Sequence, residues 1–359
     1  MTEVRRIDIA GVPRNEAGNL LREHFQSREQ PSYRARQVEE WIFDRLAMSF
    51  EEMTNLPQSE RLALAGSFAF TVLATDRVSR SADGTAKHLW RLSDGELIES
   101  VLIPSGPRLT LCISSQAGCA MACTFCATGW LGYQRQLTAG EIAAQYRQAR
   151  AWAQENGYGD ITNIVFMGMG EPFMNPKALF PTLEILNQGY GVGARRITVS
   201  TVGVVPGIDE LGALPEQFRL AVSLHAPNSD LRSELIPLEK KYPLPRLLEA
   251  LRTFDAAGGK RITFEYVMID GVNDSFAIAD ELAVLVAEFQ AFVNLIPFNP
   301  IPGTDWRPTP APRLRAFATR LESHGIPVHV RTPRGRDIAA ACGQLKAEAT
   351  SGRLVQLGG

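Results

Sequence analysis

The chain lacks long apolar runs. No stretch reaches the roughly 20 consecutive apolar residues that a helix needs to cross a bilayer. The first residues, Met1-Thr-Glu-Val-Arg-Arg-Ile-Asp8, contain no apolar signal core. We therefore expect a cytoplasmic protein with no membrane partner. The sequence also contains no internal repeat and no low-complexity tract.

Cysteine and net charge are both scarce. The chain has five cysteines, an odd number, and three of them stand at ligand spacing, which argues for a reducing compartment and against a disulfide framework. The formal net charge is −2, so any contact with nucleic acid must depend on local patches. With 359 residues, of which 45% are hydrophobic and 21% charged, the chain is an ordinary globular protein with a large core.

The three clustered cysteines occur in the segment Cys119-Ala-Met-Ala-Cys123-Thr-Phe-Cys126. Their spacing lets three thiolates bind one metal centre and leaves a fourth position open. A structural zinc site needs four protein ligands, and the nearest histidine, His88, lies far upstream with no His-x3-His partner. A [4Fe–4S] cluster held by three cysteines keeps one iron open, so we predict one such cluster. The alternatives are a zinc knuckle completed by a remote ligand and three buried thiols.

Residues 1–75 are predicted to form a helical accessory domain, because Val38, Trp41 and Ile42 recur at helical spacing. Residues 76–106 contain short alternating stretches around Asp83-Gly84, a dipeptide favoured in hairpin turns. This segment is expected to be a small β linker that joins the accessory domain to the core.

Residues 107–345 alternate strand-like and helix-like runs, which is typical of parallel strands with helical crossovers. We predict an α/β fold with an open, partial (β/α)6 barrel, because the strands fall short of eight. Residues 346–359 are expected to form a C-terminal tail. The predicted strands are Leu109–Ser114, Ile161–Met167, Arg196–Ser200, Phe218–Ser223, Ile262–Met268 and Phe292–Pro297. One predicted helix begins at the capping box Thr138-Ala-Gly-Glu141. The other predicted helices are Pro176–Asn187, Pro243–Ala257, Ser275–Phe289 and Pro312–Ser323.

The carboxyl ends of parallel strands share one edge of a sheet, so the residues that follow them are expected to form the site around the cluster. These segments are the cysteine loop, Met167-Gly-Met-Gly-Glu171-Pro172, Ser200-Thr-Val-Gly203, Ser223-Leu-His225 and Phe298-Asn299-Pro300. Gly168-Met-Gly170 is a poor dinucleotide fingerprint, because Phe173 occupies the third glycine position.

The cysteine triplet with Phe125 resembles the cluster loop of radical S-adenosylmethionine (SAM) enzymes, and Gly170-Glu171-Pro172 resembles their motif for the methionine amino group. More closely, the chain resembles the RlmN/Cfr family of RNA adenine methyltransferases over most of its length. The matching segments are Tyr33–Phe43, Gln116-Ala-Gly-Cys119, Met167-Gly-Met-Gly-Glu-Pro172, Ser223-Leu-His-Ala-Pro-Asn228, Glu265-Tyr-Val-Met268, Asn294-Leu-Ile-Pro-Phe-Asn-Pro300 and Ala341-Cys342-Gly-Gln-Leu345.

The resemblance implies methylation of adenine C2 in 23S rRNA (position 2503) and in tRNA (position 37), with two SAM molecules. Adenine C2 lies between two nitrogens and is a poor nucleophile, so a radical route is reasonable. In the family, the cysteine matching Cys342 takes a methyl group from one SAM. A second SAM yields a 5′-deoxyadenosyl radical that removes a hydrogen from this S-methyl group, and the resulting methylene radical adds to the base.

The other catalytic residues also follow from the resemblance. Cys112 matches the cysteine that resolves the protein–RNA adduct through a disulfide bond with Cys342. Glu99 matches the proton acceptor, a role that the Cys112 thiolate could take instead. Without the resemblance, Cys112 would be interpreted as a small buried hydrophobe and Glu99 as a solvated strand residue.

The resemblance further assigns SAM contacts. The Glu171 carboxylate can accept hydrogen bonds from the methionine ammonium, and hydroxyl and amide side chains suit the ribose, the carboxylate or the adenine edges. Gly168 and Gly170 allow close backbone approach. Without the motif, His225 could equally be a core histidine. The residues assigned to SAM are Gly170, Glu171, Ser200, Ser223, Leu224, His225 and Asn299.

The expected partners are 23S rRNA, tRNA and a low-potential electron donor such as flavodoxin or ferredoxin, for a monomeric enzyme. The target adenine is expected to flip out of its stack to reach the site. The accessory domain is a second candidate RNA-binding surface. The candidate basic patches are Arg34 with Arg36, Arg195-Arg196, Lys240-Lys241, and Arg331 with Arg334 and Arg336, of which the last is favoured because it lies beside Cys342.

Three other functions remain open at this stage. A Cfr-like enzyme would methylate C8 of the same rRNA adenine with the same cysteines. A radical SAM enzyme of another purpose would leave Cys112 and Cys342 without a role. A metal-binding RNA module without enzymatic activity would not cleave SAM.

Overall fold

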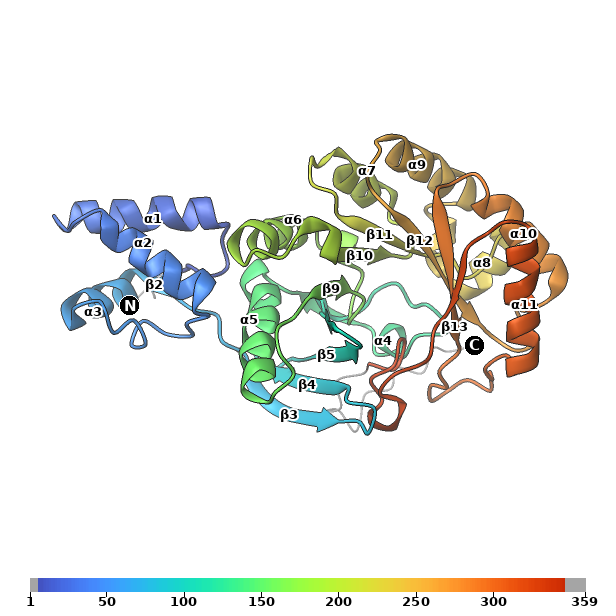
Figure 1. The fold of residues 1–359 in the computed structure, drawn as a ribbon, viewed down its shortest axis with the longest axis horizontal. Coiled ribbons are helices and arrows are strands. Elements are labelled where there is room, and N and C mark those ends of the chain that lie inside the picture. The colour runs from blue at the N-terminus through green and yellow to red at the C-terminus, as the bar shows by residue number, and fades with distance from the viewer. Residues whose placement is uncertain (1–5, 346–359) are drawn as a thin grey trace.

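The structure is a computed structural model that describes residues 6–345, so the predicted tail at 346–359 lies outside the described residues. Its main sheet has ten strands in the order β14-β13-β12-β11-β10-β9-β6-β5-β4-β3. The sheet curves into an open barrel with helices on its outer side (Figure 1). The strands are β3 (Ala74–Arg80), β4 (Ala86–Arg91), β5 (Leu97–Ser105), β6 (Arg108–Cys112), β9 (Asn163–Phe166), β10 (Ile197–Thr201), β11 (Arg219–Ser223), β12 (Ile262–Met268), β13 (Ala291–Pro297) and β14 (Val328–Val330).

The strands from β6 to β14 in this order are all parallel, which confirms the predicted α/β barrel. All six predicted strands are present, and β12 matches its predicted bounds. Every residue of β12 is buried, as expected for a strand covered on both faces. A seventh parallel strand, β14, was not predicted because three residues are too short to show a pattern.

The outer helices include every predicted one. The capping box at the start of α5 is confirmed, because the Thr138 hydroxyl accepts from the Glu141 amide and the Glu141 carboxylate accepts from the Thr138 amide at 2.9 Å. The short helices α7 and α8 were not predicted. The helices are α5 (Ala139–Glu155), α6 (Pro176–Glu184), α7 (Val205–Ala213), α8 (Ser229–Leu235), α9 (Leu244–Ala256), α10 (Phe276–Val286) and α11 (Ala311–Ser323).

Residues 76–106 were expected to form a small β linker, and in the structure they belong to the main sheet. The strands β3, β4 and β5 are antiparallel as predicted, but they continue the main sheet, because β5 pairs with β6 in the register Val101↔Cys112. This pairing covers the edge of β6 that would otherwise expose unpaired backbone groups. The hairpins are therefore one wall of the barrel.

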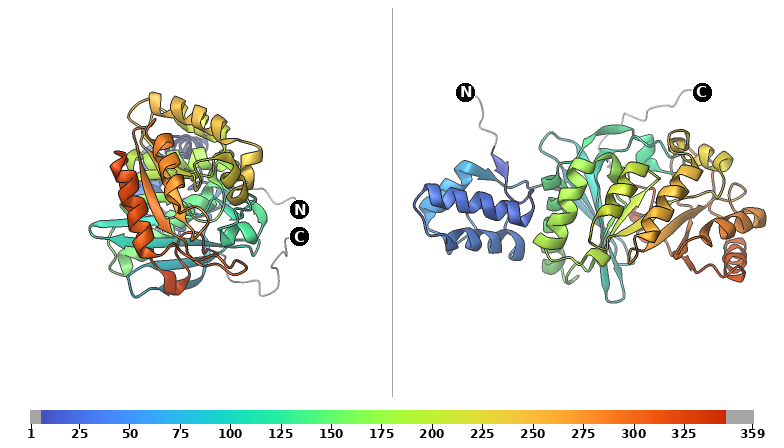
Figure 2. Two further views of the ribbon diagram at one scale, coloured as in Figure 1. Left: turned by 90° about the vertical axis from the view of Figure 1, so that its right-hand side faces the viewer. Right: turned by 90° about the horizontal axis from the view of Figure 1, so that it is seen from above.

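Residues 6–69 form a helical lobe at one end of the molecule (Figure 2). It contains α1 (Arg14–Ser27), α2 (Tyr33–Glu39) and α3 (Gln58–Ser67), and Val38 and Ile42 lie in its core as their spacing predicts. The rings of Phe43 and Tyr190 meet at 5.5 Å, so the lobe packs against the turn after α6. Among the described residues, no helix is long and apolar enough to cross a membrane.

Candidate active site

A cavity opens at the carboxyl ends of the parallel strands. Its empty space is about 930 Å³, including the part open to solvent. All the segments predicted to meet at this edge contribute to its wall, although they are far apart in the sequence. The lining residues include Cys119, Cys123, Cys126, Gly170, Glu171, Ser200, Ser223, His225, Glu265, Asn299 and Cys342.

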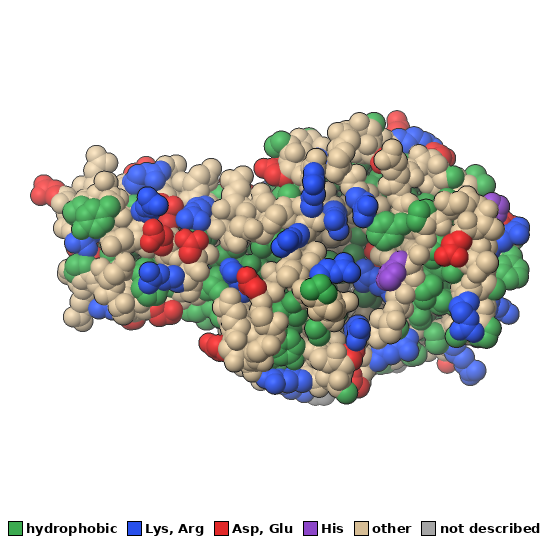
Figure 3. All heavy atoms as spheres, viewed as in Figure 1, with side chains coloured by type: hydrophobic (Ala, Val, Ile, Leu, Met, Phe, Trp, Pro, Cys, Tyr) green, Lys and Arg blue, Asp and Glu red, His purple; other side chains and the backbone are tan. Residues whose placement is uncertain are grey.

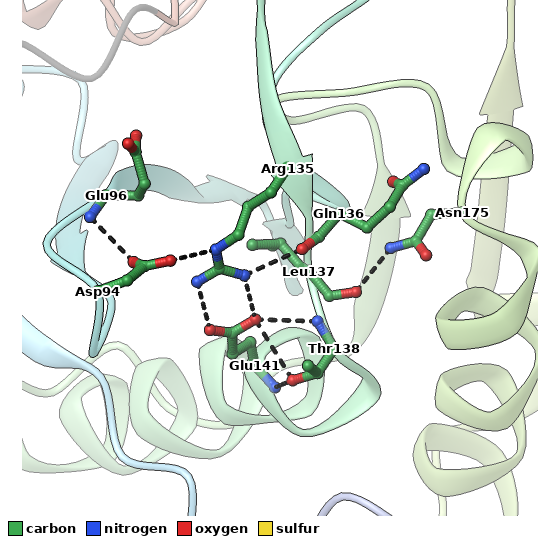
Figure 4. Close-up of polar contacts among 8 residues, drawn as sticks. All are labelled: Asp94, Glu96, Arg135, Gln136, Leu137, Thr138, Glu141 and Asn175. Carbon is green, nitrogen blue, oxygen red and sulfur yellow. Dashed lines mark hydrogen bonds and ion pairs between the residues drawn. The ribbon is translucent and has the colours of Figure 1, made fainter.

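The cysteine loop is anchored at both ends by a small hairpin of β7 (Gln116–Gly118) and β8 (Tyr133–Gln136). Figure 4 shows how Arg135 of β8 bridges Asp94, from the turn between β4 and β5, to Glu141 at the start of α5. The guanidinium bonds to both Glu141 oxygens at 2.8 Å. The loop therefore rises from a base that is cross-linked to the sheet and to a helix.

The three cysteines of the loop share the cavity wall. Burial raises the pKa of Cys119 to about 12 and raises that of Cys123 well above its ordinary value, and the neighbouring thiols add to both shifts. Three thiolates at this place need a cation to neutralise them, so the donor set fits an iron–sulfur cluster. In the part of the chain that the structure describes, no three Cys, His, Asp or Glu side chains are arranged around a single ion. Cluster thiolates bind different iron atoms and need not meet at one point.

Glu171 is a buried carboxylate on the same wall. Its oxygens accept from the amides of Val202 at 2.9 Å and Phe173 at 3.2 Å. Burial raises the pKa of Glu171 to about 7. No arginine or lysine among the described residues forms an ion pair with it, so the site has room for a cationic group such as the ammonium of SAM.

Gly170 fixes the turn that presents Glu171. Its φ is +97°, and a Cβ atom there would lie 2.5 Å from the Cβ of Gln116. The Gln116 side chain also accepts from the Glu171 amide at 2.8 Å. The close backbone approach that Gly170 allows is therefore between its own turn and the segment that contains Gln116.

The remaining residues assigned to SAM fall into two groups. Ser200, Ser223, His225 and Asn299 line the cavity, whereas the Leu224 side chain is buried in the hydrophobic core and is not part of the lining. His225 Nδ1 accepts from the Val267 amide at 3.0 Å, so a neutral ring carries its proton on Nε2. Burial lowers the pKa of His225 to about 3, which keeps the ring neutral.

Cys342 reaches the cavity on the C-terminal loop of residues 331–345, which we call the Cys342 loop. Cys342 is exposed, and it lines the cavity. Asn299 Nδ2 donates to its carbonyl oxygen at 3.0 Å, and the Ala127 amide donates to the Gly343 carbonyl at 2.7 Å. Desolvation by the cavity wall raises the pKa of the Cys342 thiol, and the positive charge of the Arg331 guanidinium opposes this rise.

Cys112 and Glu99 are not among the residues that line the cavity. Burial raises the pKa of Cys112 to about 12, and the Cys342 thiol contributes to this shift, so the two thiols are electrostatic neighbours. Glu99 has no exposed surface and pairs with Lys87 at 2.8 Å, so it is not a solvated strand residue. Lys87 Nζ also donates to the Ala339 carbonyl at 3.1 Å, which links this pair to the Cys342 loop.

A second cavity lies at the opposite mouth of the barrel, with about 1590 Å³ of empty space including solvent. Met167 and Glu265 line both cavities, so the two adjoin. Lys and Arg side chains gather across the middle of the face in Figure 3, over the curved strands of Figure 1. The basic residues that line this cavity are Arg108, Arg219, Arg261, His329, Arg331 and Arg334.

Sequence reasoning missed Arg108, Arg219 and Arg261. They begin or immediately precede the parallel strands β6, β11 and β12, and this shared position was a usable signal that they meet at one mouth. In the described chain none of the three has a carboxylate partner, and repulsion from Arg261 and Arg108 adds to the burial that lowers the pKa of Arg219.

Four residues of the predicted basic patches have polar partners within the protein. Arg36 pairs with Glu40 at 3.5 Å, Arg336 donates to Asn299 at 2.8 Å, and Arg195 donates to Gln217 at 2.6 Å. Of the favoured cluster, Arg331 lies 3.9 Å from Glu265 and Arg334 lines the second cavity.

Two family models match the chain. Residues 113–282 match the radical SAM superfamily, and residues 14–69 match the N-terminal domain of ribosomal RNA large subunit methyltransferases. The first match spans the strands from β9 to β12 and the cysteine loop, and the second coincides with the helical lobe.

Similar proteins cover almost the whole chain. A protein of Gemmatimonas aurantiaca named "Probable dual-specificity RNA methyltransferase RlmN" is 52% identical over 93% of this chain and 92% of its own length. The "Dual-specificity RNA methyltransferase RlmN" of Anaeromyxobacter is 46% identical over 89% of this chain and 86% of its own.

A solved structure agrees with these relatives. The crystal structure of a radical SAM methyltransferase from Sphaerobacter thermophilus superposes with a TM-score of 0.90, at 47% identity, over 95% of this chain and 100% of that one. Membership of the radical SAM superfamily implies an iron–sulfur cluster and SAM. The chain belongs to the radical SAM superfamily and, within it, to the RlmN family of RNA methyltransferases.

Proposed function

We propose that this protein methylates C2 of adenine in 23S rRNA and tRNA, with Cys342 as the methyl carrier and two SAM molecules consumed for each methyl group. The observation that carries the proposal is the position of Cys342. It comes from the far end of the chain, and it lines the same cavity as the three loop cysteines and Glu171. A thiol at this place can receive a methyl group from SAM and present it to a base.

Cys119, Cys123 and Cys126 would hold a [4Fe–4S] cluster. When bound, this cluster supplies the electron, received from flavodoxin or ferredoxin, that cleaves SAM into a radical able to remove hydrogen from a methyl group. The Glu171 carboxylate accepts hydrogen bonds from the methionine ammonium, and the His225 Nε2–H group donates to an acceptor on SAM. The Ser200 and Ser223 hydroxyls bind its polar edges.

Cys342 first acts as a nucleophile. Its sulfur forms a bond to the SAM methyl carbon while the bond from that carbon to the sulfonium sulfur breaks. S-adenosylhomocysteine leaves, and the thiol proton passes to solvent. Arg331 favours this step because its positive charge stabilises the thiolate. The bonds from Asn299 and Ala127 hold the Cys342 backbone in place during the transfer.

Cys112 is proposed to resolve the adduct between Cys342 and the base. The Cys112 thiol loses its proton as its sulfur attacks the Cys342 sulfur and a disulfide forms. The bond from Cys342 to the methylene carbon breaks with its electron pair moving to that carbon, which takes up a proton and becomes the methyl group. For the proton acceptor we retain Glu99, because the raised pKa of Cys112 opposes a standing thiolate, whereas Glu99 is an ion-paired carboxylate.

RNA is proposed to approach from the second cavity. The unpaired guanidiniums of Arg108, Arg219 and Arg261 suit phosphate contacts, and a flipped adenine could then pass through the barrel toward Cys342. This route replaces the predicted role of Arg336, whose guanidinium already binds Asn299.

The experiment that tests the proposal maps the modified base. Protein reconstituted with iron and sulfide under anaerobic conditions, reduced and supplied with SAM, should methylate protein-free 23S rRNA at adenine C2, as detected by nucleoside mass spectrometry. A C8 product would assign a Cfr-like activity and contradict the proposal. Cleavage of SAM without methylation of RNA would assign the protein to another class of radical SAM enzyme.

A further inference from the structure

Glu265 is a buried carboxylate for which the proposed mechanism has no role. It lies within β12 and is 4% exposed, yet it lines both cavities and so stands where they adjoin. Asn294 Nδ2 donates to Glu265 Oε1 at 2.8 Å, which fixes the orientation of the carboxylate. The second oxygen, Oε2, is buried and has no hydrogen-bond partner among the described residues.

A buried carboxylate oxygen without a donor is costly to the folded protein. The nearest guanidinium, that of Arg331, approaches the other oxygen at 3.9 Å. An unpaired oxygen that borders a cavity therefore indicates a ligand that brings a donor with it.

The surroundings of Glu265 indicate which ligand this is. Glu265 and the proposed methyl carrier Cys342 line the same cavity, and the charge of Glu265 adds to the burial that raises the pKa of Cys342. A base that receives the methyl group must lie beside the same sulfur. The methionine ammonium of SAM already has Glu171 as its acceptor in the proposed mechanism, whereas the 6-amino group of adenine, a donor, still lacks one.

We propose that Glu265 Oε2 accepts a hydrogen bond from the 6-amino group of the target adenine and that this bond makes the enzyme selective for adenine. The inference rests on the proposed function and identifies the group that recognises its substrate. A 6-oxo base would point an acceptor at the carboxylate and be repelled, and a purine without a 6-substituent would leave the oxygen unpaired. A charge-assisted hydrogen bond of this kind corresponds to about a 10- to 100-fold preference.

The test uses three versions of one tRNA, with adenine, unsubstituted purine or hypoxanthine as the target base, because all three keep hydrogen at C2. Single-turnover methylation should be about 10- to 100-fold faster on adenine than on purine with the wild-type enzyme. In Glu265→Gln the amide nitrogen would replace Oε2. This variant should lose the preference over purine and gain in relative rate on hypoxanthine, whose 6-oxo group can accept from the amide.

Two variants serve as controls. Glu249 is exposed on α9, and Glu249→Gln should leave all three rates unchanged. Glu265→Asp keeps the charge but withdraws it from the cavity, so it should retain part of the adenine preference and remains informative if Glu265→Gln does not fold.

The outcomes separate the inference from the proposed function. A wild-type enzyme that methylates none of the RNAs contradicts the proposed function. An active wild-type enzyme together with a Glu265→Gln variant that keeps the full adenine preference overturns the inference alone. A Glu265→Gln variant that keeps this preference but binds SAM more weakly would assign Glu265 to SAM. A Glu265→Gln variant that keeps the preference but accumulates a Cys342–RNA adduct would show that Glu265 is a proton acceptor. Weaker SAM binding and adduct accumulation would each overturn the inference.

Discussion

Glu171 should make the affinity of the site for SAM depend on pH. Its pKa of about 7 is raised by burial, so protonation removes the acceptor for the methionine ammonium at and below that pH. SAM affinity should therefore increase as pH rises toward and through 7, by up to about tenfold per pH unit on the acid side. Equilibrium binding to the cluster-loaded enzyme measures this.

In the ligand-free protein, Glu171 makes folding stability change with pH in the direction opposite to that of SAM affinity. A carboxyl whose folded pKa lies above its unfolded value contributes stability at low pH that is lost as pH rises through about 7. The Glu171→Gln variant should bind SAM weakly at every pH, and its SAM affinity should not depend on pH. If the SAM affinity of this variant still changes with pH, another group is responsible for the change.

The Lys87–Glu99 pair is a second residue-scale feature with a testable cost. Lys87 and Glu99 side chains are 4% and 0% exposed, so removal of the cation leaves a buried carboxylate without its ion-pair partner. Lys87→Met should lower the free energy of unfolding by about 3 kcal/mol, as measured by urea denaturation. Lys177→Met, at an exposed position on α6, is the matched control and should change it little. Equal stability of the two variants would show that the pair is dispensable.

Sequence reasoning identified residues whose chemistry is encoded in local spacing and missed those defined by burial. The cysteine triplet and Glu171 could be predicted because ligand spacing and a motif are local. In the sequence, Glu265 is distinguished only by its place in a segment that matches the family, because its unpaired oxygen exists only once β12 and β13 are side by side. Leu224 lies in a matching motif but its side chain packs in the core.

At the scale of elements, the turn after β9 depends on Gly170. Alanine there would combine an unfavourable positive φ with a contact of 2.5 Å to Gln116, so the turn must shift and carry Glu171 with it. Gly170→Ala should lose most SAM binding, as measured by calorimetry. Gly191→Ala is the control, because Gly191 has a φ of +72° but open space around it, and it should cost only about 1 kcal/mol of stability and no affinity. Unchanged SAM affinity in Gly170→Ala would contradict this role.

The elements themselves were largely predictable where periodicity is strong. The parallel strands and α5 carry long apolar patterns and a capping box, and they form as expected. The sequence does not reveal which edge a hairpin will pair with, so the junction of β5 with β6 could not be foreseen. The same holds for β14, which is completed by its pairing with β13.

At the scale of the whole molecule, the two mouths of the barrel have different chemistry. One carries the loop cysteines and Glu171, and the other carries unpaired arginines. Arg219→Ala should weaken RNA binding and reduce the slope of log affinity against log salt by about 1, because one phosphate contact is lost. Arg252→Ala is the control, since Arg252 pairs with Glu288 at 2.7 Å on the outside of the barrel. Equal salt slopes for both variants would exclude the second cavity as the RNA surface.

The central claim is that Cys342 carries the methyl group, and peptide mass spectrometry tests it most directly. Cluster-loaded enzyme incubated with SAM bearing a labelled methyl group, before RNA is added, should contain labelled S-methylcysteine at residue 342, and the label should pass to the RNA adenine once RNA is supplied. Cys342→Ala should carry no label and methylate no RNA. Enzyme that methylates RNA while Cys342 remains an unmodified thiol throughout would contradict the account.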